Sequence, residues 1–227
     1  ATKTYVERVQ RLLKGETIDW DFEGKDRKIG FLNPDLNLIN IEDDVPLWFS
    51  AFGPKAKGVA AELGAGWLNF GATGALESLT EMREIWEGAG HPAEELKSNL
   101  FFLGAVLDGD DAGDEAKLMA EAGPLTAVMF HNMADEVGAM GGRNLPSGEL
   151  SNLLGEYLKS HDKYQPEDAK YLQNHRGHLM FLRPEETHIT PELVKATTMS
   201  GTKTELIERM QALQDAGYDQ VTVQLVH

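Results

Sequence analysis

The sequence has 227 residues, 41% of them hydrophobic and 26% charged, which is typical of a globular protein long enough to bury a sizeable core. Its 37 acidic and 21 basic residues give a net charge of −16, and no basic run is present that would neutralise phosphates, so we expect no binding to nucleic acid or to an anionic membrane surface. The lack of cysteine excludes disulfides, thiolate metal sites and a cysteine nucleophile.

Two further features of the sequence indicate where in the cell the protein is expected. No stretch approaches about 18 uninterrupted apolar residues, so we expect no membrane span. The amino-terminal sequence ATKTYVERVQRLL lacks the basic-then-apolar pattern of a secretory signal, which favours the cytoplasm.

The chain opens with an amphipathic pattern over residues 4–14, which predicts a helix that ends at Gly15. Residues 16–44 follow as an irregular excursion with turn residues such as Gly24 and Gly30. We expect short strands or hairpins in this excursion.

The most informative stretch covers residues 45–71 and reads VPLWFSAFGPKAKGVAAELGAGWLNFG. Apolar runs at 45–49 and 67–70 predict two strands, and small and apolar residues at helical spacing predict a helix over 55–63. Strand, tight turn, helix and strand in so short a segment form a βαβ unit. Such a unit needs parallel strands with helices packed outside them.

The turn between the first of these strands and the helix is a candidate anion site. Pro54 suits the first helical position, where a missing N–H costs nothing, and Gly53 lets a ligand approach the backbone. The amides of a first helical turn can hold a phosphate, and Lys55 either adds its charge or is simply solvated. The alternative is an ordinary strand-to-helix turn with glycine for geometry alone. The candidate cofactor-binding residues are Ser50, Ala51, Phe52, Gly53, Pro54 and Lys55.

Asn69, Phe70 and Gly71 close the second strand of the βαβ unit. They should face the same end of the sheet as the glycine turn, which is where barrel enzymes place their chemistry, and they are therefore candidate substrate-pocket residues. Trp67 and Trp48 lie within apolar runs, so we interpret them as core residues and not as ligand-stacking residues.

The remainder of the chain alternates helices and strands. Expected helices cover residues 76–90, 111–140 with a break near Gly123-Pro124, 150–160, 166–174, 191–198 and 202–216; expected strands cover 100–107, 178–182 and 220–226, and a loop covers 141–148. The last helix has the clearest signals, with Thr202 as N-cap, Glu205 at the capping-box position and Gly217 as C-cap.

Strands that alternate with helices predict an α/β fold. Strand candidates near 47, 67, 100 and 221 give about four βα units, half of an eight-unit barrel. We therefore expect a single α/β domain over residues 1–227, an incomplete barrel that is either cut from a longer chain or completed by association. Its expected parts are the irregular excursion (16–44), a βαβαβ core (45–107), a helical insertion region (108–200) and a closing αβ unit (201–227).

Signals for metal binding and for hydrolysis are weak. Asp108 and the acids after it resemble the start of a calcium loop, but the twelfth place holds Met119 instead of a bidentate glutamate. His175 and His178 have a spacing that could serve a metal on a helix, although the glycine between them and the apolar run after them argue against it. His131 is interpreted as a packed histidine. No HExxH, GxSxG or GxxxxGK[ST] motif is present, so we expect no metal site and no hydrolase chemistry.

Three segments resemble the luciferase-like flavin and deazaflavin oxidoreductases, in the family's order and spacing. The segment SAFGPKAKGVAAELGAGWLNFG is similar to the family's strand that ends in A-x-G-P-K and to the helix that follows it. The segment TMSGTKTELIERMQALQDAGYDQVTVQL resembles the family's closing S-G-T-x-x-E unit, and YVERVQRLLKGE resembles the helix before its fifth strand.

This resemblance implies a TIM barrel of which the chain carries strands five to eight, with a cofactor across the carboxyl ends of the strands. It implies an oxidoreductase, either a monooxygenase or a dehydrogenase/reductase, that uses FMN or a deazaflavin coenzyme on a small organic substrate. The family's turn after strand five contacts the cofactor's phosphate or side chain, and it corresponds to Ala51, Phe52, Gly53 and Lys55. The end of strand six, here residues 69–71, borders the substrate pocket. The A-x-G-P-K form is closer to the deazaflavin branch than to the FMN monooxygenases.

The chain also departs from the family pattern. The family's first four strands, which supply the usual catalytic histidine and acid, have no counterpart, so the catalytic residues are unknown and the chain alone is expected to be inactive. Ala65 stands where the family has aspartate, and the helix expected after the final strand is missing. The expected partner is a second copy or the amino-terminal half of the same barrel. The alternative function is a non-catalytic half-barrel that binds a phosphate-bearing ligand or a partner chain.

Overall fold

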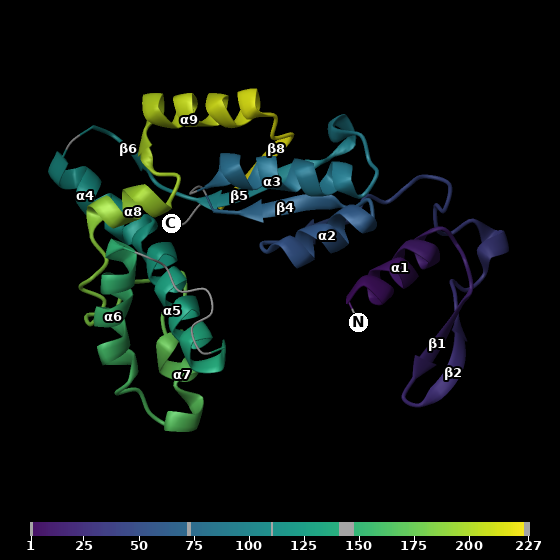
Figure 1. The fold of residues 1–227 in the computed structure, drawn as a ribbon, viewed down its shortest axis with the longest axis horizontal. Helices are drawn as coiled ribbons and strands as arrows, with labels where there is room; N and C mark the ends of the chain where they lie inside the picture. The colour runs from purple at the N-terminus through teal and green to yellow at the C-terminus, as the bar shows by residue number, and fades with distance from the viewer. Residues whose placement is uncertain (1, 72–73, 110, 141–147, 225–227) are drawn as a thin grey trace. The chain divides into compact units, whose positions relative to one another are not determined.

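The computed structural model of the chain describes residues 2–71, 74–109, 111–140 and 148–224. These residues form two compact units, each described by itself below (Figure 1). The first unit comprises Ala1–Asn69 and Glu77–Asn99, and the second comprises Phe70–Leu76 and Leu100–His227.

The elements that lie wholly or mainly in the first unit include the predicted βαβ segment. In chain order they are α1 (Thr2–Leu13), β1 (Ile18–Phe22), β2 (Lys25–Ile29), the 3-10 turn η1 (Pro34–Leu36), β3 (Trp48–Ser50), α2 (Pro54–Glu62), β4 (Gly66–Phe70), α3 (Ala75–Gly88) and the 3-10 turn η2 (Ala93–Glu95). Strand β5 (Ser98–Leu103) begins in the first unit and ends in the second.

The second unit is mostly helical. Its elements are β6 (Val106–Leu107), α4 (Asp111–Glu121), α5 (Gly123–Met140), α6 (Glu149–His161), the 3-10 turn η3 (Glu167–Ala169), α7 (Tyr171–Asn174), α8 (Pro191–Thr197), β7 (Gly201–Thr202), α9 (Lys203–Ala216) and β8 (Gln220–Gln224).

The principal sheet has the strand order β3-β4-β5-β8. Strands β3 and β4 run parallel, with Ser50 opposite Leu68, so their carboxyl ends share one edge of the sheet. Strands β6 and β7 form a separate parallel pair, and β1 and β2 form an antiparallel hairpin. The predicted α/β class is therefore confirmed. The strands described here do not close into a barrel, so the expected half-barrel is not confirmed.

The core of the second unit lies among α4, α5, α6 and α8, which gather together in Figure 1. Apolar side chains repeat on one face of each helix and are buried there against the other helices. The buried members of this cluster are Ala105, Leu107, Leu118, Ala122, Ala127, Phe130, Ala134, Leu154, Tyr157, Ile189 and Val194.

Several local predictions are confirmed. The hairpin β1-β2 occupies the irregular excursion, and α4 gives way to α5 at Gly123, next to the predicted break. Thr202 accepts from the Glu205 N–H while the Glu205 carboxylate accepts from the Thr202 N–H, which completes the capping box. Gly217 caps the same helix with a left-handed φ of 95°. The predicted loop at 141–148 lies outside the described residues except for Gly148.

The strand predicted at 178–182 is wrong. His178 to Phe181 form successive turns, in which the N–H groups of Met180 and Phe181 both donate to the Gly177 carbonyl. Gly177 and Leu179 have φ values of 78° and 58°, which a strand does not allow. The apolar run was misleading because its side chains are partly exposed and no neighbouring strand pairs with it.

Two other strand predictions need new boundaries. The run at 100–107 is divided between β5 and β6, because the chain passes Met199 so closely at Gly104 that an added Cβ would lie 1.7 Å from the Met199 carbonyl oxygen. The strand predicted at 45–49 begins only at Trp48. The helix predicted at 166–174 is likewise two short pieces, η3 and α7.

Candidate functional site

The predicted anion site is a well-defined turn between β3 and α2. Gly53 is the N-cap of α2 with extended φ and ψ of −94° and 162°, and Pro54 occupies the first helical position. The Gly53 carbonyl accepts the N–H groups of Ala56 and Lys57. The amides of Gly53 and Lys55 have no hydrogen-bond partner within the described part of the chain. An added Cβ on Gly53 would meet nothing within 4 Å, so the backbone here is open to a ligand.

The turn is exposed on one side and anchored in the core on the other. Phe52 is 63% exposed and Lys55 is exposed, whereas Ala51 is fully buried. The Ala51 N–H donates to the Leu68 carbonyl at 3.4 Å, and the Ala51 carbonyl accepts from the Trp67 indole Nε1 at 2.9 Å. Trp67 itself is fully buried, as predicted. The loop that would meet a ligand is thus fixed by a core residue of the neighbouring strand.

The buried cation Lys57 was missed by the sequence analysis. Its side chain is 1% exposed, and its Nζ donates to Ser78 Oγ at 2.9 Å and to the carboxylate of Glu81. The same Nζ lies 5.3 Å from the centroid of the Trp67 ring, within cation–π range. Lys57 therefore fastens α2 to α3 and to the core of the sheet. Its helical spacing to the buried Ala60 and Ala61 was the signal that could have revealed it.

The three candidate substrate-pocket residues do not share one compact unit. Asn69 belongs to the first unit, is 5% exposed, and lies at the same sheet edge as Ser50 because β3 and β4 are parallel. Phe70 and Gly71 belong to the second unit. There the Phe70 ring stacks on Phe101 with centroids 5.2 Å apart, and the Gly71 N–H donates to the Phe101 carbonyl.

The interpretation of both tryptophans as core residues is correct for Trp67 and wrong for Trp48. It is 37% exposed, and its ring covers Gly66, where an added Cβ would come within 2.8 Å of the ring atoms. Trp48 therefore lies at the border of the core, in an apolar run that is only partly buried.

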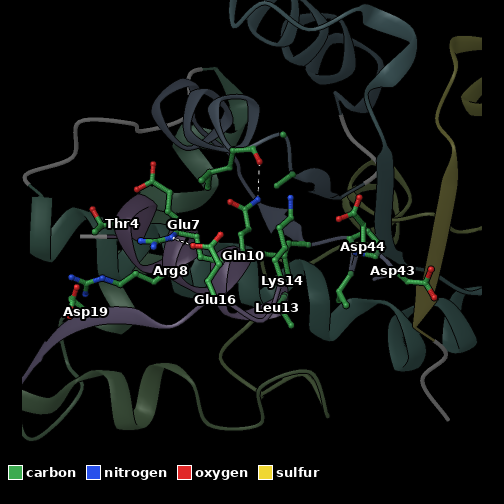
Figure 2. Close-up of a pocket in the computed structure, with 17 residues that line it drawn as sticks. Thr4, Glu7, Arg8, Gln10, Leu13, Lys14, Glu16, Asp19, Asp43 and Asp44 are labelled. Atoms are coloured by element: carbon green, nitrogen blue, oxygen red, sulfur yellow. Dashed lines mark hydrogen bonds and ion pairs between the residues drawn. The ribbon is translucent and has the colours of Figure 1, made fainter. Parts of the chain in front are cut away.

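A cavity of about 960 Å³ lies elsewhere in the first unit (Figure 2). It is bounded by α1, by the segment that leads into β3, and by Leu63, Gly64 and Ala65, which precede β4. Its position is thus at the amino ends of these strands, at the opposite edge from the glycine turn. Figure 2 shows charged side chains of both signs around it, from Glu7 and Arg8 on α1 to Asp43 and Asp44. The predicted cofactor turn does not line this cavity.

A second polar feature is the ion network around Arg183 in the helical unit. Arg183 is 6% exposed, and its guanidinium donates to Glu186 Oε1 at 2.6 Å, to Tyr157 Oη at 2.8 Å and to Tyr164 Oη at 3.0 Å. Glu186 Oε1 also lies 2.6 Å from His131 Nε2. A buried guanidinium and carboxylate with this many partners satisfy each other's hydrogen-bonding capacity.

The network extends toward the surface through a buried amide. Tyr157 donates to Asn174 Oδ1 at 2.6 Å, and Asn174 Nδ2 donates to Asp135 Oδ1 at 2.8 Å and to the His131 carbonyl at 2.9 Å. Asp135 Oδ2 is in turn 2.6 Å from His175 Nε2. None of these links was predicted, because their partners are far apart in the sequence.

The network has marked effects on ionisation. Burial alone would raise the pKa of Glu186, but hydrogen bonds from His131 and Arg183 outweigh it and lower that pKa to about 2. Burial raises the pKa of Tyr157, although the charge of Arg183 opposes this effect. Burial lowers the pKa of His188 to about 4. The carboxylate of Glu186 is therefore ionised and the ring of His188 neutral near pH 7.

Comparisons with known proteins give one family and a shared fold. The family model described as luciferase-like monooxygenase matches residues 1–220. No curated protein sequence gives a significant match.

Among the helices described, none is long and apolar enough to span a bilayer.

Two solved structures illustrate the shared fold. A coenzyme F420-dependent tetrahydromethanopterin reductase from Methanopyrus kandleri aligns with a TM-score of 0.61 and 15% identity, over 97% of this chain and 56% of that one. An F420-dependent secondary alcohol dehydrogenase in complex with an F420–acetone adduct aligns with a TM-score of 0.52 and 16% identity, over 98% of this chain and 54% of that one. The chain thus spans about half the length of the structures it matches.

Proposed function

The chain belongs to the luciferase-like monooxygenase family, and from this premise we propose that it is an oxidoreductase that uses a flavin-type cofactor on a small organic substrate. In such enzymes the cofactor carries the redox chemistry, and the protein binds, orients and shields it. The observation that carries the proposal is the family match over residues 1–220 together with an open, anchored glycine turn at the start of α2.

We assign residues 50–55 to the anionic arm of the cofactor. The amides of Gly53 and Lys55 stand at the positive end of the α2 dipole, which favours a phosphate or carboxylate. The exposed Lys55 side chain adds a positive charge to the same turn. Trp67 and Lys57 keep the turn in place before a ligand arrives, so little ordering is needed on binding.

A deazaflavin is the preferred cofactor, with FMN as the alternative. The sequence A-F-G-P-K at residues 51–55 has the form that resembles the deazaflavin branch. The two solved structures named above are both described as F420-dependent enzymes. In this proposal Asn69, Phe70 and Gly71 border the substrate, and the reaction is a hydride or electron transfer between the cofactor and that substrate.

We also propose that a partner covers the apolar surface of residues 31–45, with a second copy of the chain preferred to the amino-terminal half of the same barrel. In this segment Leu32 is 84% exposed and Leu38 is 72% exposed, and Ile39, Ile41 and Val45 are exposed as well. Contiguous apolar surface of this kind marks an interaction site. Light scattering of the purified chain tests the idea, with a dimer mass expected and a monomer mass at every concentration contradicting it.

The proposed function is tested by titrating the purified chain into F420 and, separately, into FMN. Both cofactors fluoresce, so binding is read as a saturable change in emission. We expect saturable binding of F420 at least about tenfold tighter than that of FMN, a difference of about 1.4 kcal/mol. The absence of a saturable change with either compound would overturn the cofactor assignment, and tighter binding of FMN would reverse the choice of cofactor.

A further inference from the structure

Three histidines from two separate segments of the second unit come together. One ring nitrogen from each of His131, His175 and His178 lies within 4.8 Å of the others. His131 is buried on α5, His175 is half-buried just after α7, and His178 is exposed in the turn that follows. The cluster therefore includes both a buried and an exposed side chain, and His178 is its exposed member.

Two carboxylates determine which ring nitrogens carry protons. Glu186 Oε1 lies 2.6 Å from His131 Nε2, and Asp135 Oδ2 lies 2.6 Å from His175 Nε2. A carboxylate oxygen accepts from a ring N–H at such a contact, so both contacts point to Nε2 as the donor nitrogen. Nδ1 is then the nitrogen of each ring that is left for a ligand. Arg183 Nη2 donates to Glu186 Oε1 at 2.6 Å and also lies at hydrogen-bond distance, 3.0 Å, from His131 Nε2, so the guanidinium and the carboxylate compete for that nitrogen.

The Nδ1 atom of His131 is the least satisfied atom of the cluster among the residues that the structure describes. His131 is 2% exposed, and its Nδ1 has no hydrogen-bond partner in the described part of the chain. Buried polar atoms are almost always partnered, so this nitrogen is open to a ligand; His161 Nε2 and His188 Nε2 are unpartnered as well, but only His131 has two further histidines beside it. His175 Nδ1 has only the His178 Nδ1 beside it, at 3.3 Å.

The geometry fits a tetrahedral metal ion. Zinc–nitrogen bonds of about 2.0–2.1 Å place two tetrahedral ligands about 3.4 Å apart. His175 Nδ1 and His178 Nδ1 already have this separation. Since the third nitrogen is within 4.8 Å, bringing it to the ligand separation takes a movement of at most about 1.5 Å.

We propose that His131, His175 and His178 bind a zinc ion, because one ring nitrogen of each lies within 4.8 Å of the others while carboxylates contact Nε2 of two of the rings. A carboxylate that orients a ligating histidine is the usual outer-shell arrangement of zinc sites. Imidazole nitrogens suit zinc, and a water molecule would complete the fourth position. The three histidines belong to the second unit, whereas the proposed cofactor turn belongs to the first.

The ion would fasten an irregular segment to the helical core. The turn from His175 to Phe181 contains two left-handed residues, Gly177 and Leu179, and belongs to no helix or strand. Asn174, the last residue of α7 and next to this segment, already donates to Asp135 and to the His131 carbonyl. A metal bound to His175 and His178 on one side and to His131 on the other would add a second connection between the segment and α5, beside the hydrogen bonds of Asn174.

The test is a zinc titration of the purified chain without a polyhistidine tag, after removal of metal with a chelator. A chromophoric zinc indicator gives the affinity, and Co²⁺ gives the visible absorption of a tetrahedral site. We expect one equivalent of zinc, a tetrahedral Co²⁺ spectrum and a higher melting temperature with zinc. Failure to compete with the indicator at micromolar zinc, or an octahedral Co²⁺ spectrum, would overturn the proposal.

Three variants locate the ion. His178→Gln changes an exposed side chain and Asp135→Asn changes the carboxylate behind His175, and each should weaken zinc binding by about 10–100-fold. His91→Gln is the matched control, because His91 lies in the first unit and contacts the Ala61 carbonyl, and it should leave the affinity unchanged. Unchanged affinity in His178→Gln, or an equal loss in His91→Gln, would contradict the assignment.

Discussion

The indole nitrogen of Trp67 donates a hydrogen bond of 2.9 Å to the carbonyl oxygen of Ala51. This bond joins a fully buried side chain on β4 to the turn that follows β3, next to the exposed Phe52 and Gly53. The position of the proposed cofactor turn therefore depends on a residue that does not itself meet the cofactor.

Replacing Trp67 by Phe should destabilise the first unit. The change leaves the Ala51 carbonyl buried without its partner, which costs about 1–3 kcal/mol of unfolding free energy. Urea denaturation measures the loss. Trp48→Phe is the control, since Trp48 is 37% exposed. If Trp48→Phe lowered the unfolding free energy as much as Trp67→Phe does, the anchoring role of Trp67 would be contradicted.

Lys57 and Lys55 should have opposite roles, although they are two residues apart. Lys57→Met removes charge-assisted bonds to Ser78 and Glu81 and should lower the unfolding free energy by about 1–2 kcal/mol. Lys55→Met changes an exposed side chain and should alter stability by less than about 0.5 kcal/mol. In cofactor titrations, Lys55→Met should weaken binding and reduce its dependence on salt. If only Lys55→Met lowered the unfolding free energy, the structural role assigned to Lys57 and the binding role assigned to Lys55 would both be refuted.

Arg183 should be essential to the second unit because Glu186 is buried beside it. Arg183→Met leaves that carboxylate without its main partner, and about 3–5 kcal/mol of unfolding free energy should be lost. Adding Glu186→Gln should restore part of the loss, since no buried charge then remains unpaired. The exposed Arg176 provides the control, and Arg176→Met should change stability by less than about 0.5 kcal/mol. If the double variant is no more stable than Arg183→Met, the pairing is not what stabilises the unit.

His188 should make the second unit less stable in mild acid. Burial lowers its pKa to about 4, below the ordinary value of 6.5, so the unfolded chain binds the proton more readily between these pH values. The unfolding free energy should therefore fall as pH drops from 6.5 to about 4, by about 1–2 kcal/mol after allowance for partial exposure. Glu186, with its pKa lowered to about 2, contributes stability that is lost only below its ordinary value of 4.5.

His188→Gln removes this titration and should flatten the stability profile between pH 6.5 and 4.5. Chemical denaturation of both proteins at several pH values gives the comparison. An identical slope in the two proteins would show that another group is responsible.

Local structure was largely predictable from the sequence because its signals are local. The capping box at Thr202, the C-cap at Gly217 and the Gly53-Pro54 turn each depend on residues within a few positions of one another. The strand predicted at 178–182 failed because an apolar run fixes neither burial nor a pairing partner. Met180, in the middle of that run, is 74% exposed.

The buried polar groups could not be predicted. Arg183 contacts His131 and Tyr157, which are 52 and 26 residues away in the sequence. No local sequence pattern predicts such contacts. The histidine cluster was missed for the same reason. The spacing of His175 and His178 was visible, but His131 joins them only through the packing of α5.

The most direct test of the cofactor turn compares Gly53→Asp with Gly53→Asn. Gly53 has an extended backbone and open space around its Cβ position, and both residues are good N-caps, so the two variants should fold alike and differ in one negative charge. Fluorescence titration with F420 then isolates the electrostatic contribution. If residues 50–55 hold the anionic arm, the aspartate variant should bind at least about tenfold more weakly than the asparagine variant. Equal affinities in the two variants would contradict the assignment of this turn to the cofactor.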